Sequence, residues 1–306
     1  MPSHEVIDRF VGLRALVIGD AMLDSYLEGT ATRLCREGPV PVVKREWEQH
    51  VPGGAANSAA NLHALGASVR FVALAGADDA ATMLRAVLRE RGIDDGDIAS
   101  DERARTLRKL RIVANGQYVV RFDEGELTTC SELSRRRVVA SFDDAIGQCD
   151  VAIVSDYGYG TVSDAIVERL RHRSFQGVLV VDAKDPRRFY GTHPTALTPN
   201  QQETERAAEM AGVGADGELL IAKLEHAGEA LRSRTGAHAV VVTLAERGAL
   251  VVTASGSEHV ACRPVDNAGG IGAGDSFTAA FALALGAGAD LASAARLGNA
   301  AAAIAV

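Results

Sequence analysis

A carboxylate directly follows a turn of small residues in the stretch N-A-G-G-I-G-A-G-D-S-F at residues 267–277. Gly272, Ala273 and Gly274 let another group approach the backbone, and the apolar run after them predicts a helix that begins here. The free N–H groups and the dipole at a helix N-terminus favour an anion. Asp275 would then stand where it can take a proton from an attacking hydroxyl. The stretch indicates phosphoryl transfer to an alcohol, although an ordinary loop with a helix N-cap fits the same residues.

Two aspartates follow the first predicted strand. The apolar run 14–20 predicts a buried strand, and Asp20 and Asp24 stand at or just past its end in G-D-A-M-L-D. Ligands of parallel α/β sheets gather at the carboxyl ends of the strands, so one of these carboxylates can hold sugar hydroxyls. Surface carboxylates in a turn are the alternative, because Asp is common in turns.

A glycine pair and an asparagine pair come next, in V-P-G-G-A-A-N-S-A-A-N at residues 51–61. Gly53 and Gly54 predict a turn, and a helix is expected over residues 55–65. Asn57 and Asn61 share one face of that helix, where small neighbours leave room for a ligand. A solvated helix face would carry the same two side chains.

Two later strand ends carry polar groups that suit a nucleotide. Asn200 and Glu203 form N-x-x-E at a strand-to-helix junction, where a carboxylate can hold Mg²⁺ beside phosphates. A capping box, with Asn at the N-cap and Glu three residues later, fits the same spacing. Thr243, Glu246 and Gly248 follow another strand and can border the nucleotide.

A small separate sheet is predicted from residues 39–47 and from alternating runs at 107–113 and 118–122. Prolines make the first run an edge strand, and Asn-Gly at 115–116 indicates a hairpin. Lys109 and Arg111 lie on this hairpin and can meet a substrate phosphate. The small sheet has no obvious helix to cover its apolar face, so we expect it to pack on a second subunit.

Elsewhere, strands and helices alternate along the chain. Strands are expected over 69–75, 151–155, 178–181, 196–198, 240–243 and 249–253, and helices over 78–91, 131–146, 162–173 and 218–231, and from about 201, 273 and 291. This alternation predicts an α/β fold with a central, mostly parallel sheet and helices on both faces. We expect one domain over residues 1–306.

The composition suits a cytoplasmic protein. The net charge is −8, so neither nucleic acid nor a membrane surface is an expected partner. The four cysteines are scattered and form no C-x-x-C, as in a reduced protein without a zinc site. The apolar run near the N-terminus is too short to span a membrane and lacks the layout of a signal peptide.

Taken together, these pieces resemble the ribokinase-like (PfkB) carbohydrate kinases over nearly the whole chain. The landmarks are G-D-x-x-x-D at 19–24, P-G-G-A-A-N at 52–57, T-P-N-x-x-E at 198–203, V-V-T at 241–243 and G-A-G-D at 272–275. Within that family the chain looks most like kinase domains that phosphorylate D-glycero-D-manno-heptose 7-phosphate at the anomeric hydroxyl. S-D-Y-G-x-G at 155–160 and D-A-K at 182–184 are among the stretches that carry this closer likeness.

The resemblance implies a role for each matching residue. Asp275 matches the general base, with an anion hole formed by Gly272, Ala273 and Gly274. The substrate side would comprise Asp20, Asp24, Gly53, Gly54, Asn57, Lys109, Arg111 and Asp156. The nucleotide side would comprise Lys184, Asn200, Thr243, Glu246, Gly248 and Asn299, with Glu203 at Mg²⁺.

The sequence departs from the family pattern at a few positions. The family usually reads D-x-T-G-A-G-D, but Gly269 stands here at the Asp position and Ile271 at the Thr position, with Asp266 three residues upstream. Tyr159 replaces the Lys of D-Y-G-K-G. One hydrogen bond to a charged group contributes about 1.5–3 kcal/mol, so we expect an active enzyme that binds ATP less tightly than its relatives.

The resemblance therefore implies a kinase that uses ATP and Mg²⁺ to phosphorylate the anomeric hydroxyl of heptose 7-phosphate. It also implies a homodimer joined through a β-sheet lid at about 24–48 and 105–124. The alternatives are a kinase for another sugar, sugar phosphate or nucleoside, and a catalytically inactive sugar- or nucleotide-binding protein. Some bifunctional relatives carry a nucleotidyltransferase domain, but no H-x-G-H motif occurs here, so only the kinase activity is expected.

Overall fold

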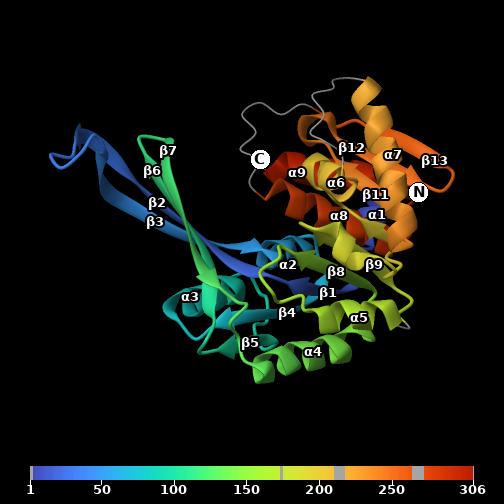
Figure 1. Ribbon diagram of the computed structural model, residues 1–306, viewed down its shortest axis with the longest axis horizontal. Coiled ribbons are helices and arrows are strands. Elements are labelled where there is room, and N and C mark those ends of the chain that lie inside the picture. The colour runs from blue at the N-terminus through green and yellow to red at the C-terminus, as the bar shows by residue number, and fades with distance from the viewer. Residues whose placement is uncertain (1–2, 173–174, 210–217, 264–271, 306) are drawn as a thin grey trace.

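The computed structural model describes residues 3–172, 175–209, 218–263 and 272–305, in which helices surround a large sheet and a small sheet projects from the body (Figure 1). The strands of the large sheet are β1 (Arg14–Gly19), β4 (Ser68–Gly76), β5 (Ile98–Asp101), β8 (Val151–Asp156), β9 (Val178–Ala183), β10 (Ala196–Leu197), β11 (Ala239–Thr243), β12 (Ala249–Thr253) and β13 (Gly256–Val260). Their order is β13-β12-β11-β10-β9-β8-β1-β4-β5. Only the pairings of β12 with β11 and β13 are antiparallel among these described strands. The sheet is therefore mostly parallel, as the alternating pattern predicted.

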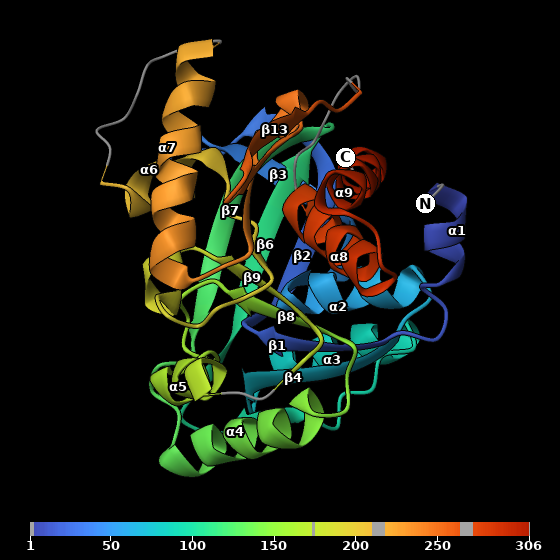
Figure 2. The same cartoon turned by 90° about the vertical axis from the view of Figure 1, so that its right-hand side faces the viewer.

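Helices cover both faces of this sheet (Figure 2). They are α1 (Ser3–Asp8), α2 (Ala55–Ala64), α3 (Asp79–Glu90), α4 (Glu132–Ile146), α5 (Asp164–His172), α6 (Gln201–Ala207), α7 (Glu218–Thr235), α8 (Ala273–Gly286) and α9 (Leu291–Ala305). Side chains alternate along each strand, so β1 contributes to two cores. Val17 packs in one core with residues of α2, α3, α8 and α9, and Ile18 packs in the other with residues of α4, α5 and α7. None of the helices in the described part of the chain has the length and apolar character needed to cross a bilayer.

The small sheet has four strands in the order β3-β2-β6-β7. They are β2 (Ala21–Leu34), β3 (Pro41–Gly54), β6 (Arg105–Ala114) and β7 (Gln117–Glu126). The hairpin predicted around Asn115 joins β6 to β7, and the predicted edge strand is part of β3. β2 starts directly after β1, so Asp24 lies inside a strand and not in a turn.

The structure corrects the turn predicted at Gly53 and Gly54. Both residues complete β3, where they pair with Met22 and Ala21 of β2. The bend into α2 is made at Gly54 alone, with φ 56°, a backbone conformation that favours glycine. The helix predicted from residue 162 begins slightly later, at Asp164.

Candidate active site

The carboxyl ends of the parallel strands lie along one edge of the large sheet, where they meet a cavity of about 240 Å³. Its lining comprises Asp156, Tyr157, Asp182, Lys184, Thr198, Asn200, Glu203, Thr243, Gly272, Gly274 and Asp275. All of these except Tyr157, Asp182 and Thr198 were singled out from the sequence. The structure thus brings the predicted base, the glycine turn and much of the predicted nucleotide side to one place.

The glycine turn leads into helix α8. Gly272 is its N-cap, with φ 82° and no side-chain cap. A Cβ on Gly272 would lie 2.9 Å from Nδ2 of Asn57, whereas a Cβ on Gly274 would meet nothing within 4 Å. The first N–H groups of a helix have no partner within the helix, so this end of α8 offers donors to an anion in the cavity.

Asp275 is buried in the first turn of α8 and accepts hydrogen bonds from three side chains. Nδ2 of Asn57 donates to Oδ2 at 2.8 Å, and the Tyr157 hydroxyl donates to Oδ1 at 2.9 Å. Oγ of Ser58 donates to Oδ1 at 3.4 Å. Burial raises the pKa of Asp275, and the three donors partly oppose that rise. Such a carboxylate is a stronger base than an exposed one, which suits proton transfer from a hydroxyl.

A second buried carboxyl group lies in the same cavity. Asp182 sits in β9, and burial together with the charges of Asp275 and Glu203 raises the pKa of Asp182 to about 8. Oγ1 of Thr278 donates to Oδ2 of Asp182 at 3.4 Å. A protonated Asp182 lowers the negative charge of a cavity that must receive phosphates.

Lys184, Glu203 and Asn200 form one connected group at the start of α6. Nζ of Lys184 donates to Oε1 of Glu203 at 2.7 Å, while Oε2 of Glu203 accepts from the backbone N–H of Asn200 at 2.8 Å. Oδ1 of Asn200 in turn accepts from the backbone N–H of Glu203 at 2.9 Å, which completes a capping box. Burial disfavours the charge of Lys184, but the Glu203 carboxylate raises the pKa of Lys184 overall. The cavity therefore contains a cation suited to phosphate.

The two oxygens of Glu203 bear on the predicted Mg²⁺ contact. Both oxygens already accept a hydrogen bond, so the donor set fits a contact with hydrated Mg²⁺ better than direct ligation. Mg²⁺ commonly keeps several of its waters and binds one or two carboxylates together with the phosphates of a substrate.

Asp24 and Arg111 form a buried pair in the small sheet. NH1 of Arg111 donates to Oδ1 of Asp24 at 2.9 Å, and the guanidinium lies 5.1 Å from the ring centroid of Tyr26. A Cβ on Gly53 would lie 2.7 Å from Oδ2 of Asp24, so only glycine fits beside this carboxylate. The sequence predicted that Arg111 contacts a substrate phosphate. In the structure its guanidinium forms an ion pair with Asp24. Nζ of Lys109, on the same strand, lies 5.7 Å from the ring centroid of Tyr157, a residue that lines the cavity.

Asp20 has a different position from the one expected for a sugar contact. It is fully buried, and the backbone N–H groups of Tyr157, Tyr159 and Thr161 donate to its carboxylate at 3.0, 2.9 and 2.9 Å. Both oxygens are used by the loop after β8. In this structure Asp20 therefore fixes that loop and does not line the cavity.

Three residues predicted at the nucleotide fall outside the cavity lining. A Cβ on Gly248 would lie 2.1 Å from the carbonyl oxygen of Val260, and Nδ2 of Asn299 donates to the same oxygen at 3.0 Å. Glu246 lies in the short 3-10 helix η2 (Ala245–Arg247). Their nucleotide contacts stay predictions. The departures at Asp266, Gly269 and Ile271 lie outside the described residues.

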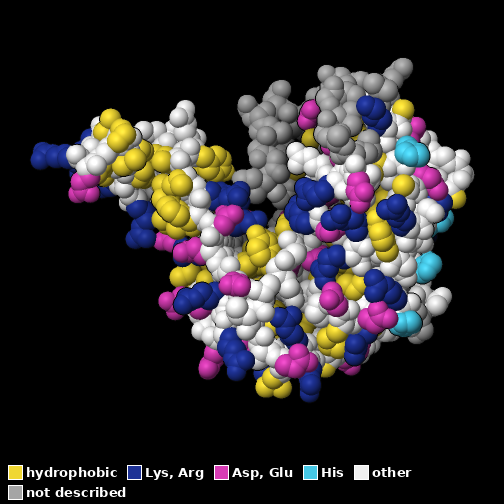
Figure 3. Space-filling model, viewed as in Figure 1, with side chains coloured by type: hydrophobic (Ala, Val, Ile, Leu, Met, Phe, Trp, Pro, Cys, Tyr) yellow, Lys and Arg dark blue, Asp and Glu magenta, His cyan; other side chains and the backbone are white. Residues whose placement is uncertain are grey.

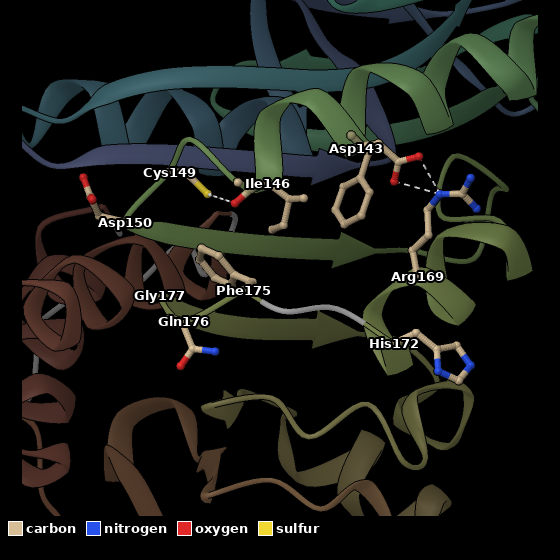
Figure 4. A pocket seen from close by; sticks show the side chains of 11 residues that line it. Asp143, Ile146, Cys149, Asp150, Arg169, His172, Phe175, Gln176 and Gly177 are labelled. Atoms are coloured by element: carbon tan, nitrogen blue, oxygen red, sulfur yellow. Dashed lines mark hydrogen bonds and ion pairs between the residues drawn. The ribbon is translucent and has the colours of Figure 1, made fainter.

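A larger hollow of about 820 Å³ lies between α4, α5 and the segments that precede β8 and β9 (Figure 4). Ile146 and Phe175 contribute apolar surface, and Nε of Arg169 donates to Asp143 at 2.7 Å. Burial raises the pKa of Cys149 to about 11, which leaves its thiol a poor nucleophile. The smaller cavity around Asp275 is the better candidate active site despite its size.

The fold agrees with that of known proteins. The chain resembles the tetrameric inhibited form of phosphofructokinase-2 from Escherichia coli, with a TM-score of 0.79, 19% identity and coverage of 96% of this chain and 93% of that one. It also resembles ribokinase from Thermotoga maritima, with a TM-score of 0.72, 24% identity and coverage of 96% and 93%. The fold is thus ribokinase-like, as the sequence motifs predicted.

The chain belongs to the family described as pfkB family carbohydrate kinase, whose sequence profile matches residues 13–306. It is 36% identical over 309 residues to the Bifunctional protein HldE of Mesorhizobium japonicum, covering 100% of this chain and 61% of that protein. The protein of the same name from Gluconobacter oxydans is 35% identical over 305 residues, with coverage of 98% and 62%. The chain thus spans about three-fifths of the length of these curated relatives. It is a sugar kinase by family.

Proposed function

We propose that this kinase transfers the γ-phosphate of ATP to the anomeric hydroxyl of D-glycero-D-manno-heptose 7-phosphate. The observation that carries the phosphoryl transfer is the position of Asp275, buried at the start of α8 beside an uncapped helix N-terminus and Lys184. The similarity to HldE proteins over essentially the whole chain supports the choice of sugar.

Residues in and beside the cavity have separate roles in the proposed reaction. Asp275 takes the proton of the attacking hydroxyl, and the N–H groups at the start of α8 offset charge on the transferred group. Lys184 offers its ammonium to the phosphates of the nucleotide, and Lys109 offers its own to the phosphate of the sugar. ATP supplies the phosphoryl group, and Mg²⁺ offsets charge on its phosphates.

Two alternative functions predict different experimental results. A kinase for an unphosphorylated sugar or for a nucleoside would not depend on Lys109, whereas a kinase for another sugar phosphate would. A catalytically inactive binding protein would bind ATP or a sugar without turnover. The departures at Gly269 and Ile271 favour this alternative, and the presence of Asp275 disfavours it.

A screen for ADP release across sugar phosphates, with both anomers of heptose 7-phosphate, tests the proposal. We expect kcat/KM to be highest for heptose 7-phosphate. Much faster turnover of another sugar would replace the substrate and leave the kinase in place. If calorimetry shows that ATP binds, but no ADP forms in the presence of any of the sugars, the protein is the inactive binding protein.

A further inference from the structure

Tyr157 is held on the active-site edge by hydrogen bonds between buried carboxylates and the backbone of its loop. It directly follows β8, and its own N–H donates to Oδ2 of Asp20 at 3.0 Å. On its N-terminal side, Oδ1 of Asp156 accepts from the backbone N–H of Gly158 at 3.0 Å, and Arg188 pairs with Oδ2 of Asp156. Two buried carboxylates thus fix the loop that carries this ring. The position of the ring is set by the fold and not by its own packing alone.

The hydroxyl of Tyr157 reaches the candidate base. It donates to Oδ1 of Asp275 at 2.9 Å, across 118 residues of sequence. Burial, together with the nearby charge of Asp275, raises the pKa of Tyr157 far above neutrality, so this hydroxyl remains a donor. With Asn57 on Oδ2, the two donors fix the orientation of the carboxylate.

The ring of Tyr157 also lies close to the two lysines with predicted phosphate contacts. Nζ of Lys109, from the small sheet, is 5.7 Å from the ring centroid, and Nζ of Lys184, from the end of β9, is 5.2 Å away. An ammonium within about 6 Å of an aromatic ring is attracted by the π-electrons of its face. One side chain therefore contacts the base, the acceptor-side cation and the nucleotide-side cation.

We propose that Tyr157 is a positioning residue of the phosphoryl transfer, which orients Asp275 through its hydroxyl and holds Lys109 and Lys184 through its ring. The inference rests on the proposed phosphoryl transfer and adds a residue to which the sequence analysis gave no role. It does not make Tyr157 an acid or a base, because its proton stays on the hydroxyl throughout. The proton of the substrate goes to Asp275.

Tyr157→Phe separates the hydroxyl from the ring. The substitution removes the hydrogen bond from the Tyr157 hydroxyl to the charged Asp275. Because a hydrogen bond to a charged group is a strong one, we expect kcat to fall about tenfold to hundredfold. The hydroxyl favours the charged form of Asp275, so its loss moves the acidic limb of the kcat/KM profile to higher pH. The ring remains, and KM for ATP and for the sugar phosphate should change little. Tyr157→Leu, which also removes the ring, should raise both KM values.

The pH profile must be assigned to Asp275 among the other charged groups of the cavity. These are Asp156, Asp182, Lys184 and Glu203. ¹³C NMR of protein labelled at the aspartate carboxyl carbons makes the assignment, because the Asp275 resonance is absent from Asp275→Asn. We expect that resonance to titrate at higher pH in Tyr157→Phe than in the wild type.

Tyr190→Phe is the matched control, because Tyr190 also has a cation over its ring but lies outside the cavity. CZ of Arg234 is 5.7 Å from its ring centroid, and NH1 of Arg234 donates to its hydroxyl at 3.3 Å. This variant should keep the wild-type profile. A Tyr157→Phe enzyme with wild-type kcat, or with an unmoved Asp275 titration, overturns the proposal. The NMR titration does not require turnover, so it gives a result even if the heptose substrate is incorrect.

Discussion

At the scale of single residues, the candidate site is a buried carboxylate with its hydrogen-bond donors. Asp275, Asn57 and Tyr157 come from three separate parts of the chain and meet within hydrogen-bond distance. The sequence predicted Asp275 because its motif is local. It gave no role to Tyr157, because the contact depends on how the loop after β8 faces α8. The strand-end sequence S-D-Y-G was the available signal, but spacing alone does not reveal the partner of a tyrosine.

Replacing Asp275 by Asn should remove the base and keep the shape of the site. Loss of a general base costs roughly 10²–10⁴-fold in rate, so kcat should fall by that factor while KM for the sugar changes little. Steady-state kinetics measures both values. Asp78→Asn is the control, because Asp78 is a helix cap away from the cavity and its substitution should leave kcat unchanged. Wild-type kcat in Asp275→Asn would remove the base from the account.

Lys109 and Arg111 should behave differently although they lie on one strand. Lys109→Ala should raise KM about tenfold to hundredfold for a sugar phosphate and little for the unphosphorylated sugar, since a charged hydrogen bond is lost. Arg111→Ala should weaken the binding of both sugars, because it leaves Asp24 buried without its partner.

Comparing KM values for the phosphorylated and free sugar tests this division. Arg121→Ala, in the neighbouring strand, removes an exposed pair with Asp123 and serves as the control. An equal effect of Lys109→Ala on both sugars would mean that this lysine does not contact the phosphate.

At the scale of elements, strongly patterned segments were predictable and the edge strands of the large sheet were not. The strand at 151–155 and the helix at 131–146 were confirmed nearly to the residue, because their apolar spacing is regular. β5 and β13, the two edge strands of the large sheet, were missed, because polar residues interrupt both and their pairing partners supply the order that their own sequence lacks. A turn was predicted at Gly53 and Gly54 because both residues are glycine. In the structure they end β3 and lead into α2.

The small sheet leaves an apolar face exposed. Val120 and Phe122 of β7 pair with Ile112 and Leu110 of β6, and Phe122 is 51% exposed. Figure 3 shows hydrophobic side chains gathered along this projecting sheet. We expect a second copy of the chain to cover this face, which would make the sheet a lid shared between two subunits.

Light scattering at increasing protein concentration tests the dimer. The wild type should have the mass of a dimer, and Val120→Lys with Phe122→Lys should give a monomer, because charges would replace the buried apolar contact. Leu133→Lys is the control, since Leu133 is 61% exposed on α4, outside the small sheet. A wild type that remains monomeric at high concentration would contradict the shared lid.

At the scale of the whole molecule, the buried carboxylates of the site should reduce the stability of the fold. The pKa of Asp182 is raised from 3.8 to about 8, so the folded protein binds a proton that the unfolded chain releases over this range. The free energy of unfolding should therefore fall as pH rises from about 4 to about 8 and then level off. Asp182→Asn should flatten this dependence and be more stable than the wild type at pH 8.

Urea unfolding at several pH values between 4 and 9 measures this effect. The pH dependence should differ between wild type and Asp182→Asn, while Asp78→Asn should follow the wild type in that window. Parallel curves for wild type and Asp182→Asn would show that Asp182 does not hold its proton in the folded state.

We propose that Asp275 and the turn before it direct a phosphoryl group to the anomeric hydroxyl of a heptose 7-phosphate. ³¹P NMR of a reaction with wild-type protein, ATP, Mg²⁺ and that sugar tests it most directly. We predict a new sugar phosphate resonance coupled to the anomeric proton, with the original 7-phosphate intact and one ADP formed per product. A new phosphate at another carbon, or an unchanged sugar beside unconsumed ATP with either anomer, would contradict the account.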